Sequence, residues 1–377
     1  MEGLLEYVRQ TRQTLHRIPE LGFDLPRTSR WIHDELIRLG YEPIPAARSG
    51  WIALLPGKSA QAVAFRADMD ALAVAEGTDR GFPSLHPGRM HACGHDGHMA
   101  LLLGFARVLK EGPVPESTVV LIFQPAEEGP GGARLIVESG ILQELQVRRI
   151  YGIHLYPGLT EGKFGLARGP FMARNGEFDI QLTGQGAHAG QPHQGIDALA
   201  AGAALVSQIH LIPSRSLDPL SPAVLNIGTF QAGEVRNAVA KEAALTGTIR
   251  AFDRLTYERI KQELEAKTQG IAHSFGVKAD LAIRDFYPEV RNDAALVDEL
   301  IGLLAPPDYE MLQPLMLAED FSFYQQEFPG VFLFLGTGSP EKGFTHPLHS
   351  PLFDFDEAVL LRGIELYRRI LGLIPEG

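Results

Sequence analysis

Two kinds of hydrophobic pattern alternate along the first part of the chain. Continuous apolar runs such as residues 118–123 are typical of strands buried on both faces. Between the runs, apolar residues recur with the period of an amphipathic helix. We expect strands at 51–55, 62–66, 118–123 and 149–154, and helices at 4–18, 26–39, from His98 onward, and at 132–138. This alternation predicts an α/β domain with a mostly parallel sheet and helices on both faces.

A different pattern begins near residue 175. Residues 177–183 alternate apolar and polar side chains, as a strand with one exposed face does. The order of elements that follows is β-α-β-β-α-β, which is the order of a ferredoxin-like unit. The expected strands are 177–183, 223–230, 243–252 and 277–283, and the expected helices are 197–209 and 255–275. We therefore predict an inserted domain at 175–287, joined by two short crossings that can serve as a hinge.

The first pattern resumes after the insertion. A helix is expected at 294–304, another opens at Glu319–Asp320, a buried strand occupies 331–335, and a last helix spans 356–373. Residues 1–174 and 288–377 are thus predicted to form one domain. The length of 377 residues agrees with two domains.

Charge and composition narrow the class of partner. The formal net charge of −12 argues against a nucleic acid or an acidic membrane as a partner. The N-terminus does not read as a signal peptide, and no apolar run approaches the roughly 20 residues that span a bilayer. A single cysteine fits a reducing compartment, so we expect a cytoplasmic protein.

Residues 89–98 contain three histidines, an aspartate and the only cysteine of the chain. Histidine and cysteine clustered in this way indicate a metal site. A lone cysteine is most often a small buried hydrophobic residue. Cys93, however, lies among histidines and glycine rather than in an apolar run, which favours a role as a ligand.

Other polar residues follow the predicted buried strands. Asp68, the pair Glu127–Glu128, and His154 each stand at or just past a strand end. In open parallel sheets the ligand crevice lies at the carboxyl ends of the strands, so one crevice can gather all of them. His349 stands in a Pro-bounded loop near the C-terminus and adds a further candidate.

The adjacent carboxylates Glu127 and Glu128 repel each other if they are desolvated, and a cation beside them removes that repulsion. One glutamate can then bind metal while its neighbour acts as general base on a metal-bound water. The alternative is a surface turn with two solvated glutamates.

Specific motifs carry a resemblance to a known family, in family order and over nearly the whole chain. Among them are FRADMDAL (65–72), MHACGHDGHMA (90–100), FQPAEEGPGGA (123–133), GIHLYPG (152–158), GQGAHAGQPHQGIDAL (184–199) and LHSPLFDFDE (348–357). The chain resembles the bimetal amidohydrolases of the aminoacylase and carboxypeptidase family, in the branch of hippurate hydrolase, IAA-amino acid hydrolases and N-acetyldiaminopimelate deacetylase.

The resemblance implies a role for each site residue. It makes Glu127 the general base and acid, and Asp68 the residue that orients a metal-ligand histidine. The resemblance also implies that the inserted domain is a lid and dimerisation domain. In that domain His188 would stabilise the oxyanion, and Asn237 and Arg250 would hold the substrate. Each lid residue has a plainer interpretation as a turn or strand-end residue. The implied ligands of two divalent metal ions (Zn, Mn, Ni or Co) are Cys93, His95, Glu128, His154 and His349.

The function so implied is hydrolysis of N-acyl-L-amino acids with acetyl, benzoyl or similar acyl groups, through Glu-assisted attack of a metal-bridging water. N-acetyldiaminopimelate deacetylase, or a dipeptidase or carboxypeptidase, is the enzymatic alternative. A non-catalytic metal- or peptide-binding protein is the alternative outside enzymes. A lid histidine that works across subunits implies a homodimer or a higher homo-oligomer.

Overall fold

The computed structural model describes residues 2–373, and it divides the chain into two compact units. The first unit contains the segments up to residue 169, 291–313, and from 320 onward. The second contains 170–290 and 314–319. The chain therefore leaves the first unit once for a long insertion and again for a short loop.

The first unit is built on a mixed, mostly parallel sheet of eight strands. The central pairs β3–β4, β3–β5 and β5–β14 are all parallel, which confirms the predicted sheet. In spatial order the strands are β1 (Ile44–Ala46), β2 (Gly50–Leu55), β4 (Ser117–Gln124), β3 (Ser59–Asp68), β5 (Val147–Thr160), β14 (Gly330–Gly338), β6 (Phe164–Leu166) and β13 (Tyr309–Met311).

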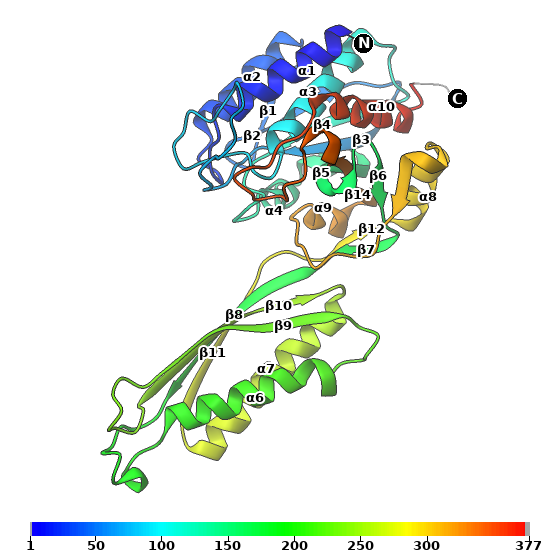
Figure 1. The fold of residues 1–377 in the computed structure, drawn as a ribbon. Helices are drawn as coiled ribbons and strands as arrows, with labels where there is room; N and C mark the ends of the chain where they lie inside the picture. The colour runs from blue at the N-terminus through cyan, green and yellow to red at the C-terminus, as the bar shows by residue number, and fades with distance from the viewer. Residues whose placement is uncertain (1, 374–377) are drawn as a thin grey trace. The chain divides into compact units, whose positions relative to one another are not determined.

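Helix α3 (His95–Glu111) lies at the centre of the first unit, packed on β3 and against α1 (Glu2–His16) and α10 (Leu360–Ile370) (Figure 1). Nearly all of α3 is buried, and its Phe105 packs against Phe65 of β3 with ring centroids 5.0 Å apart. Burial of such a side chain stabilises the fold by roughly 1.5–3 kcal/mol.

Helix α3 begins at His95, three residues earlier than predicted, because Gly94 takes the left-handed conformation (φ 87°) and reverses the chain just before it. Two further starts also differ: the helix expected from Glu319–Asp320 begins at Ser322, and the last one begins as a short 3₁₀ turn (Glu357–Val359) before α10. The remaining helices of this unit are α2 (Pro26–Arg38), α4 (Gly132–Glu138), α5 (Ile141–Glu144), α8 (Ala294–Gly302) and α9 (Ser322–Glu327).

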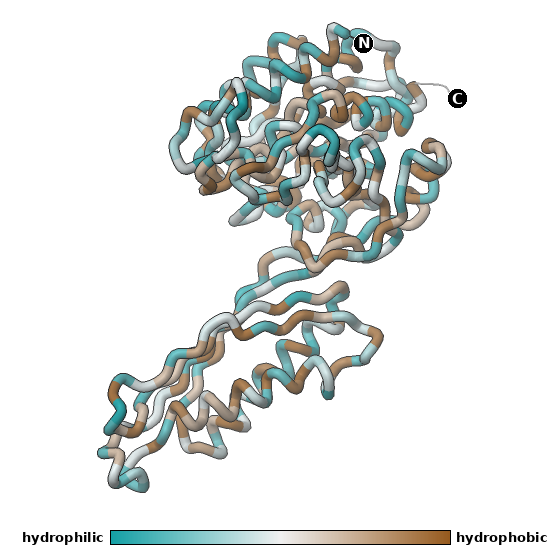
Figure 2. The backbone as a smooth tube through the Cα atoms, viewed as in Figure 1, coloured by the Kyte–Doolittle hydropathy of each residue, from teal (hydrophilic) through white to brown (hydrophobic). Residues whose placement is uncertain are grey.

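The second unit is a four-stranded antiparallel sheet with two helices on one face (Figure 1). The spatial order β11-β8-β10-β9 is the ferredoxin-like order that the sequence predicts. Hydrophobic and hydrophilic residues alternate along these strands (Figure 2), as a sheet with one covered face requires. The elements are β8 (Arg174–Thr183), α6 (Ala198–Arg215), β9 (Ala223–Ala232), β10 (Glu242–Ala251), α7 (Arg254–Phe275) and β11 (Lys278–Asp285), and the short strands β7 (Gly169–Met172) and β12 (Val290–Asn292) flank them in sequence.

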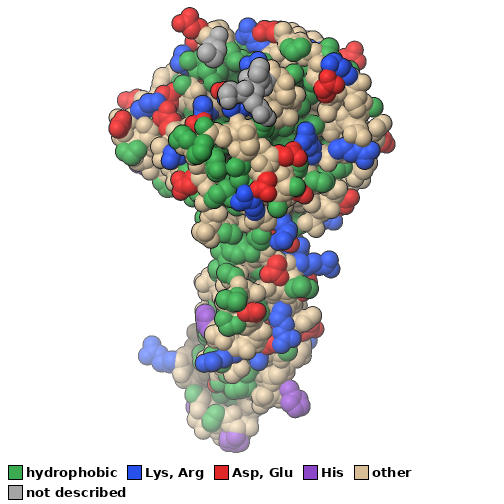
Figure 3. Space-filling view, turned by 90° about the vertical axis from the view of Figure 1, so that its right-hand side faces the viewer, with side chains coloured by type: hydrophobic (Ala, Val, Ile, Leu, Met, Phe, Trp, Pro, Cys, Tyr) green, Lys and Arg blue, Asp and Glu red, His purple; other side chains and the backbone are tan. Residues whose placement is uncertain are grey.

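The surface carries charges of both signs. On the face drawn in Figure 3, acidic and basic side chains are interspersed on each unit rather than gathered into a patch of one sign. Within residues 2–373, no helix has both the length and the apolar character needed to cross a membrane.

Candidate metal centre and catalytic site

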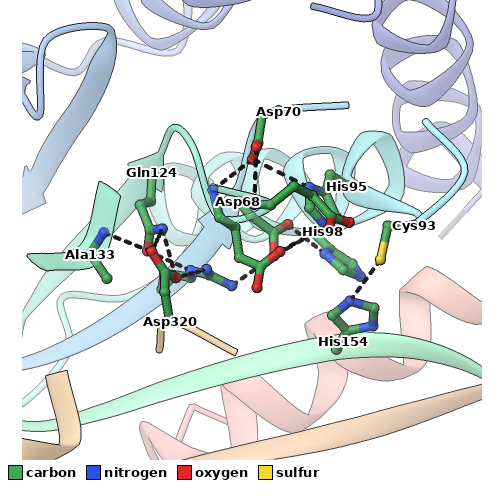
Figure 4. Close-up of polar contacts among 12 residues, drawn as sticks. Asp68, Asp70, Cys93, His95, His98, Gln124, Ala133, His154 and Asp320 are labelled. Carbon is green, nitrogen blue, oxygen red and sulfur yellow. Dashed lines mark hydrogen bonds and ion pairs between the residues drawn. The ribbon is translucent and has the colours of Figure 1, made fainter. Parts of the chain in front are cut away.

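Sheet topology brings the predicted site residues of the first unit together. β3 ends at Asp68, whose partner in β4 is Gln124, so the Glu127–Glu128 turn follows directly beside it. The β3–β5 register ends at the Arg66–Gly152 pair, which places His154 next to the end of β3. The first residue of α3, His95, and Cys93 just before the helix lie beside them (Figure 4).

Cys93 and His154 face each other. The Cys93 Sγ atom lies 3.5 Å from His154 Nε2, and His154 Nδ1 donates a hydrogen bond of 2.8 Å to the carbonyl of Leu155. The lone pair on Nε2 is therefore free and directed at the sulfur. Sulfur and nitrogen ligands of one tetrahedral ion, with bonds of about 2.3 and 2.0 Å, lie about 3.5 Å apart. The observed spacing fits a shared cation.

Cys93 also belongs to a second group of ligand atoms. Its sulfur lies within 4.8 Å of ligand atoms of Glu128 and His349. His349 Nε2 is 3.2 Å from Glu128 Oε1, a separation that two ligands of one ion also show. His349 is half exposed, whereas Cys93 is buried, so this group faces outward. Cys93 stands between the two groups, as a bridging ligand would.

His95 is buried with both ring nitrogens lacking a hydrogen bond within the described part of the chain. Nδ1 lies 3.6 Å from Asp70, and Nε2 lies 3.7 Å from Asp68 and 3.9 Å from Glu127. Burial opposes the protonated ring, but the charges of Asp68 and Asp70 raise the pKa of His95 to about 10. A histidine nitrogen that lies among carboxylates and makes no hydrogen bond is suited to binding a cation.

The electrostatics of Cys93 lead to the same conclusion. Burial, and then the charges of Glu128 and Glu127, raise the pKa of the Cys93 thiol well above its ordinary value. A thiol beside two carboxylates ionises only when a cation offsets that charge. The donor set of thiolate, imidazole and carboxylate thus fits one or two divalent ions of the zinc, nickel, cobalt or manganese type.

Asp68 and Asp70 contact different parts of the site, and the sequence did not indicate which residue makes which contact. The short hydrogen bond of Asp68, at 2.6 Å, is with His98 rather than with a predicted ligand, and Asp68 is also paired with Arg66 at 2.7 Å. Asp70 lies nearer to His95 Nδ1 and accepts the backbone N–H groups of the Glu127–Glu128 turn. Asp70 was not assigned a role from sequence, although its place two residues after Asp68 in the same strand-end motif was a usable signal.

The predicted lid residues lie at two ends of the second unit. His188 and Asn237 are neighbours: a β-bridge pairs His188 with Ala238, and the N–H of Ala189 donates to the Asn237 carbonyl. Arg250 is near the other end of β10, where its guanidinium donates to the Met316 carbonyl at 2.7 Å. The eight steps along the strand from Glu242 to Arg250 span roughly 26 Å. One lid therefore does not place all three side chains around one small substrate.

Comparisons with known proteins show which family and which fold the chain shares. Residues 64–372 match the family described as Peptidase family M20/M25/M40. The chain is 39% identical over 370 residues to an IAA-amino acid hydrolase of Arabidopsis thaliana, covering 94% of this chain and 83% of the relative. It is 36% identical over 362 residues to an N-acetyldiaminopimelate deacetylase of Exiguobacterium sibiricum, covering 94% and 96%. The fold is similar to the crystal structure of a dinuclear metal-binding peptidase of the M20 family from Bacillus subtilis, with a TM-score of 0.86, 30% identity and 99% of each chain covered.

Proposed function

The chain belongs to Peptidase family M20/M25/M40, whose members hydrolyse amide bonds, and on that premise we propose that it cleaves N-acyl-L-amino acids to a carboxylate and a free amino acid. The observation that carries the proposal is the position of Cys93. Its sulfur lies against His154 on one side and within reach of Glu128 and His349 on the other. Two sets of ligands that share one sulfur suit a two-cation site, the arrangement in which aminopeptidases polarise a carbonyl and activate a water beside a base.

We assign Cys93, His95, Glu128, His154 and His349 as the residues that hold two divalent cations. Bound there, the cations would polarise the substrate carbonyl and lower the pKa of the attacking water. A side chain of the protein must still take the proton from the water and give it to the departing amine.

Glu127 is the proposed general base and acid. Its side chain is buried, its Oε2 lies 3.9 Å from His95 Nε2, and its backbone is fixed by Asp70. A carboxylate held at this point accepts the proton from water as the water attacks the acyl carbon. The same carboxyl group then returns the proton to the departing amine. Hydrogen bonds to Asp70 keep the base in place through both steps.

The proposal also gives the second unit a role in binding substrate and in forming the oligomer. We assign residues 175–287 as a lid and dimerisation domain, in which His188 stabilises the oxyanion and Asn237 and Arg250 hold the amide and carboxylate. Because Arg250 lies about a strand's length from His188, we propose that a homodimer or higher homo-oligomer supplies the two ends from different subunits. A guanidinium recognises a carboxylate through two parallel hydrogen bonds, which suits the α-carboxylate of an amino-acid product.

The proposal leaves open which acyl group and which amino acid the substrate contains. An acetyl-specific enzyme, such as an N-acetyldiaminopimelate deacetylase, requires a small acyl pocket, and a benzoyl-specific enzyme requires an apolar slot. A dipeptidase or carboxypeptidase would release an amino acid from a peptide instead. The enzyme is assayed on acetyl-amino acids (acetyl-diaminopimelate included), benzoyl-amino acids and dipeptides, each after loading with Mn, Zn, Co or Ni.

The expected result is release of a free amino acid from at least one N-acyl-amino acid, with loss on chelation and recovery on adding metal. Turnover of dipeptides alone would favour the peptidase alternative. No turnover on the whole panel with both metal positions filled would favour the non-catalytic metal- or peptide-binding alternative.

A further inference from the structure

We propose that His98 is a positioning residue that fixes the ligand His154 through the backbone of Leu155, and that Asp68 anchors His98 for this task. The inference rests on the proposed role of His154 as a metal ligand. His98 lies in the same cluster of side chains as Asp68, His95 and His154, so distance alone would also make it a candidate ligand. Its hydrogen bonds decide between the two roles.

Both ring nitrogens of His98 are occupied within the protein. Nδ1 lies 2.6 Å from Asp68 Oδ1, and Nε2 lies 2.9 Å from the backbone nitrogen of Leu155. A backbone N–H can only donate, so Nε2 must accept, and the proton of the neutral ring is therefore on Nδ1. A ring bonded in this way has no lone pair left for a metal.

The two backbone groups of Leu155 connect the two histidines. Its N–H donates to His98 Nε2, and its carbonyl accepts from His154 Nδ1 at 2.8 Å. The hydrogen bond to the carbonyl sets the His154 tautomer and directs its Nε2 toward the Cys93 sulfur. A change in the φ or ψ angle of Leu155 would turn this acceptor away, and the N–H bond to His98 restrains the backbone of Leu155 against such a change.

Sheet geometry explains why a side chain is needed here. The β3–β5 ladder ends at the Arg66–Gly152 pair, before β5 reaches Leu155. A buried backbone N–H without an acceptor costs on the order of 1–3 kcal/mol. His98 supplies that acceptor from α3, across the gap that β3 leaves. The rings of His98 and His154 also meet edge to face, with centroids 4.5 Å apart.

Asp68 is itself held rigidly on its far side. Arg66 donates to Asp68 Oδ2 at 2.7 Å and to Asp320 at 2.9 Å, and Gln124 donates to both oxygens of Asp320 (Figure 4). All four side chains are buried. The chain of contacts from Asp320 to His154 is therefore continuous, and no member of it faces solvent.

Three substitutions separate this role from simple packing. His98→Gln keeps an acceptor near the place of Nε2, His98→Asn keeps a donor near the place of Nδ1, and His98→Phe keeps neither. If the bond to Leu155 is what matters, His98→Gln retains metal affinity within about tenfold of the wild type. His98→Asn and His98→Phe lose roughly 10–100-fold, the usual effect of removing a residue that orients a ligand.

A matched control is His16, the last residue of α1. His16 is equally buried and makes a similarly short bond, with Nδ1 2.7 Å from Asp96, and its ring partners Asp96 and Glu76 are not proposed ligands. His16→Gln is expected to lower stability without changing metal affinity. Affinity is measured by competition with a chromophoric chelator for Co²⁺, and the fold is checked by circular dichroism and thermal unfolding.

Wild-type metal affinity in folded His98→Phe would overturn the proposal. So would His98→Asn binding as tightly as His98→Gln, since the Leu155 acceptor would then be irrelevant. Where His98→Phe does not fold, the comparison of Gln with Asn decides alone. Failure of the proposed function looks different: wild-type protein would bind its metals and show the predicted order of variants, but would release no amino acid from the substrate panel.

Discussion

The carboxylate of Asp70 accepts a hydrogen bond from the backbone N–H of Glu127 at 2.9 Å, and its second oxygen accepts from the N–H of Glu128 at 3.1 Å. One side chain at the end of β3 thus fixes the turn that carries both the proposed base and a proposed ligand. Burial raises the pKa of Asp70, and the nearby ring of His95 and the N–H of Glu127 oppose that rise. The Asp70 carboxylate therefore links the Glu127–Glu128 turn to the end of β3.

Asp70→Asn should slow turnover while leaving the protein folded. An amide offers one acceptor oxygen instead of two, so one backbone N–H of the glutamate turn would face an NH₂ group. Loss of a charge-assisted hydrogen bond of about 1.5–3 kcal/mol corresponds to a fall of roughly 10–100-fold in kcat. Steady-state kinetics measure it, with the exposed Asp79→Asn as the control of equal charge change. Unchanged kcat in Asp70→Asn would show that the turn does not need this anchor.

Cys93→Ser should lower metal occupancy more than it lowers stability. The hydroxyl has nearly the same size, but it does not ionise beside Glu127 and Glu128 as a metal-bound thiolate does. We expect fewer than two metal ions per chain by elemental analysis after dialysis, with an unfolding temperature close to that of chelator-treated wild type. Two tightly held ions in the serine variant would contradict a bridging role for the sulfur.

Glu76 gives a pH dependence of stability away from the metal centre. Burial alone would raise its pKa, but hydrogen bonds from His16 and from the N–H of Ser84 lower the pKa from 4.5 to about 2. A lowered carboxyl pKa stabilises the fold above the unfolded value and loses that effect as pH falls toward the folded value. The free-energy difference between wild type and Glu76→Gln should be constant above about pH 4.5 and shrink between pH 4.5 and 2. Denaturant unfolding across this range measures it, and a difference that persists to pH 2 would show that these bonds do not lower the pKa.

Gly132 tests the turn that follows the glutamates. A Cβ at this position would lie 1.8 Å from the carbonyl oxygen of Pro125, so the turn must open to accept alanine. We expect Gly132→Ala to destabilise the protein by about 1–3 kcal/mol and to reduce activity. Gly270 in α7 is the matched control because its Cβ would meet nothing within 4 Å. Gly270→Ala should stabilise by up to about 1 kcal/mol, and equal effects of the two changes in thermal unfolding would refute the steric argument.

The hydrophobic pattern was sufficient for most elements, because continuous apolar runs mark strands buried on both faces in the first unit and alternating runs mark strands with one buried face in the second. In the second unit, the predicted helix at 255–275 differs from the observed helix by one residue at its start, and the predicted strand at 243–252 is displaced by one residue at both ends. Helix α4 has the predicted bounds, 132–138. The start of α3 was missed because it depends on a left-handed glycine, which gives no periodic signal.

The hydrogen bonds within the site could not be predicted from the sequence. The bond from Glu127 to Asp70 depends on how the turn folds back, with Ala126 in a left-handed conformation (φ 59°). The bond from His98 to Leu155 depends on where the β3–β5 ladder stops. In both, a backbone N–H donates to a side chain, and a sequence pattern specifies side chains rather than the local path of the main chain.

The measurement that most directly tests the account is paired metal analysis and turnover for Glu127→Gln. Glutamine keeps the shape and the backbone bonds to Asp70 but cannot accept a proton from water. The account predicts the wild-type content of two metal ions, substrate binding within a few-fold of wild type, and a kcat lower by roughly 100–10,000-fold. Near-normal release of amino acid by the metal-loaded variant would contradict the assignment of Glu127 as the base and, with it, the proposed mechanism.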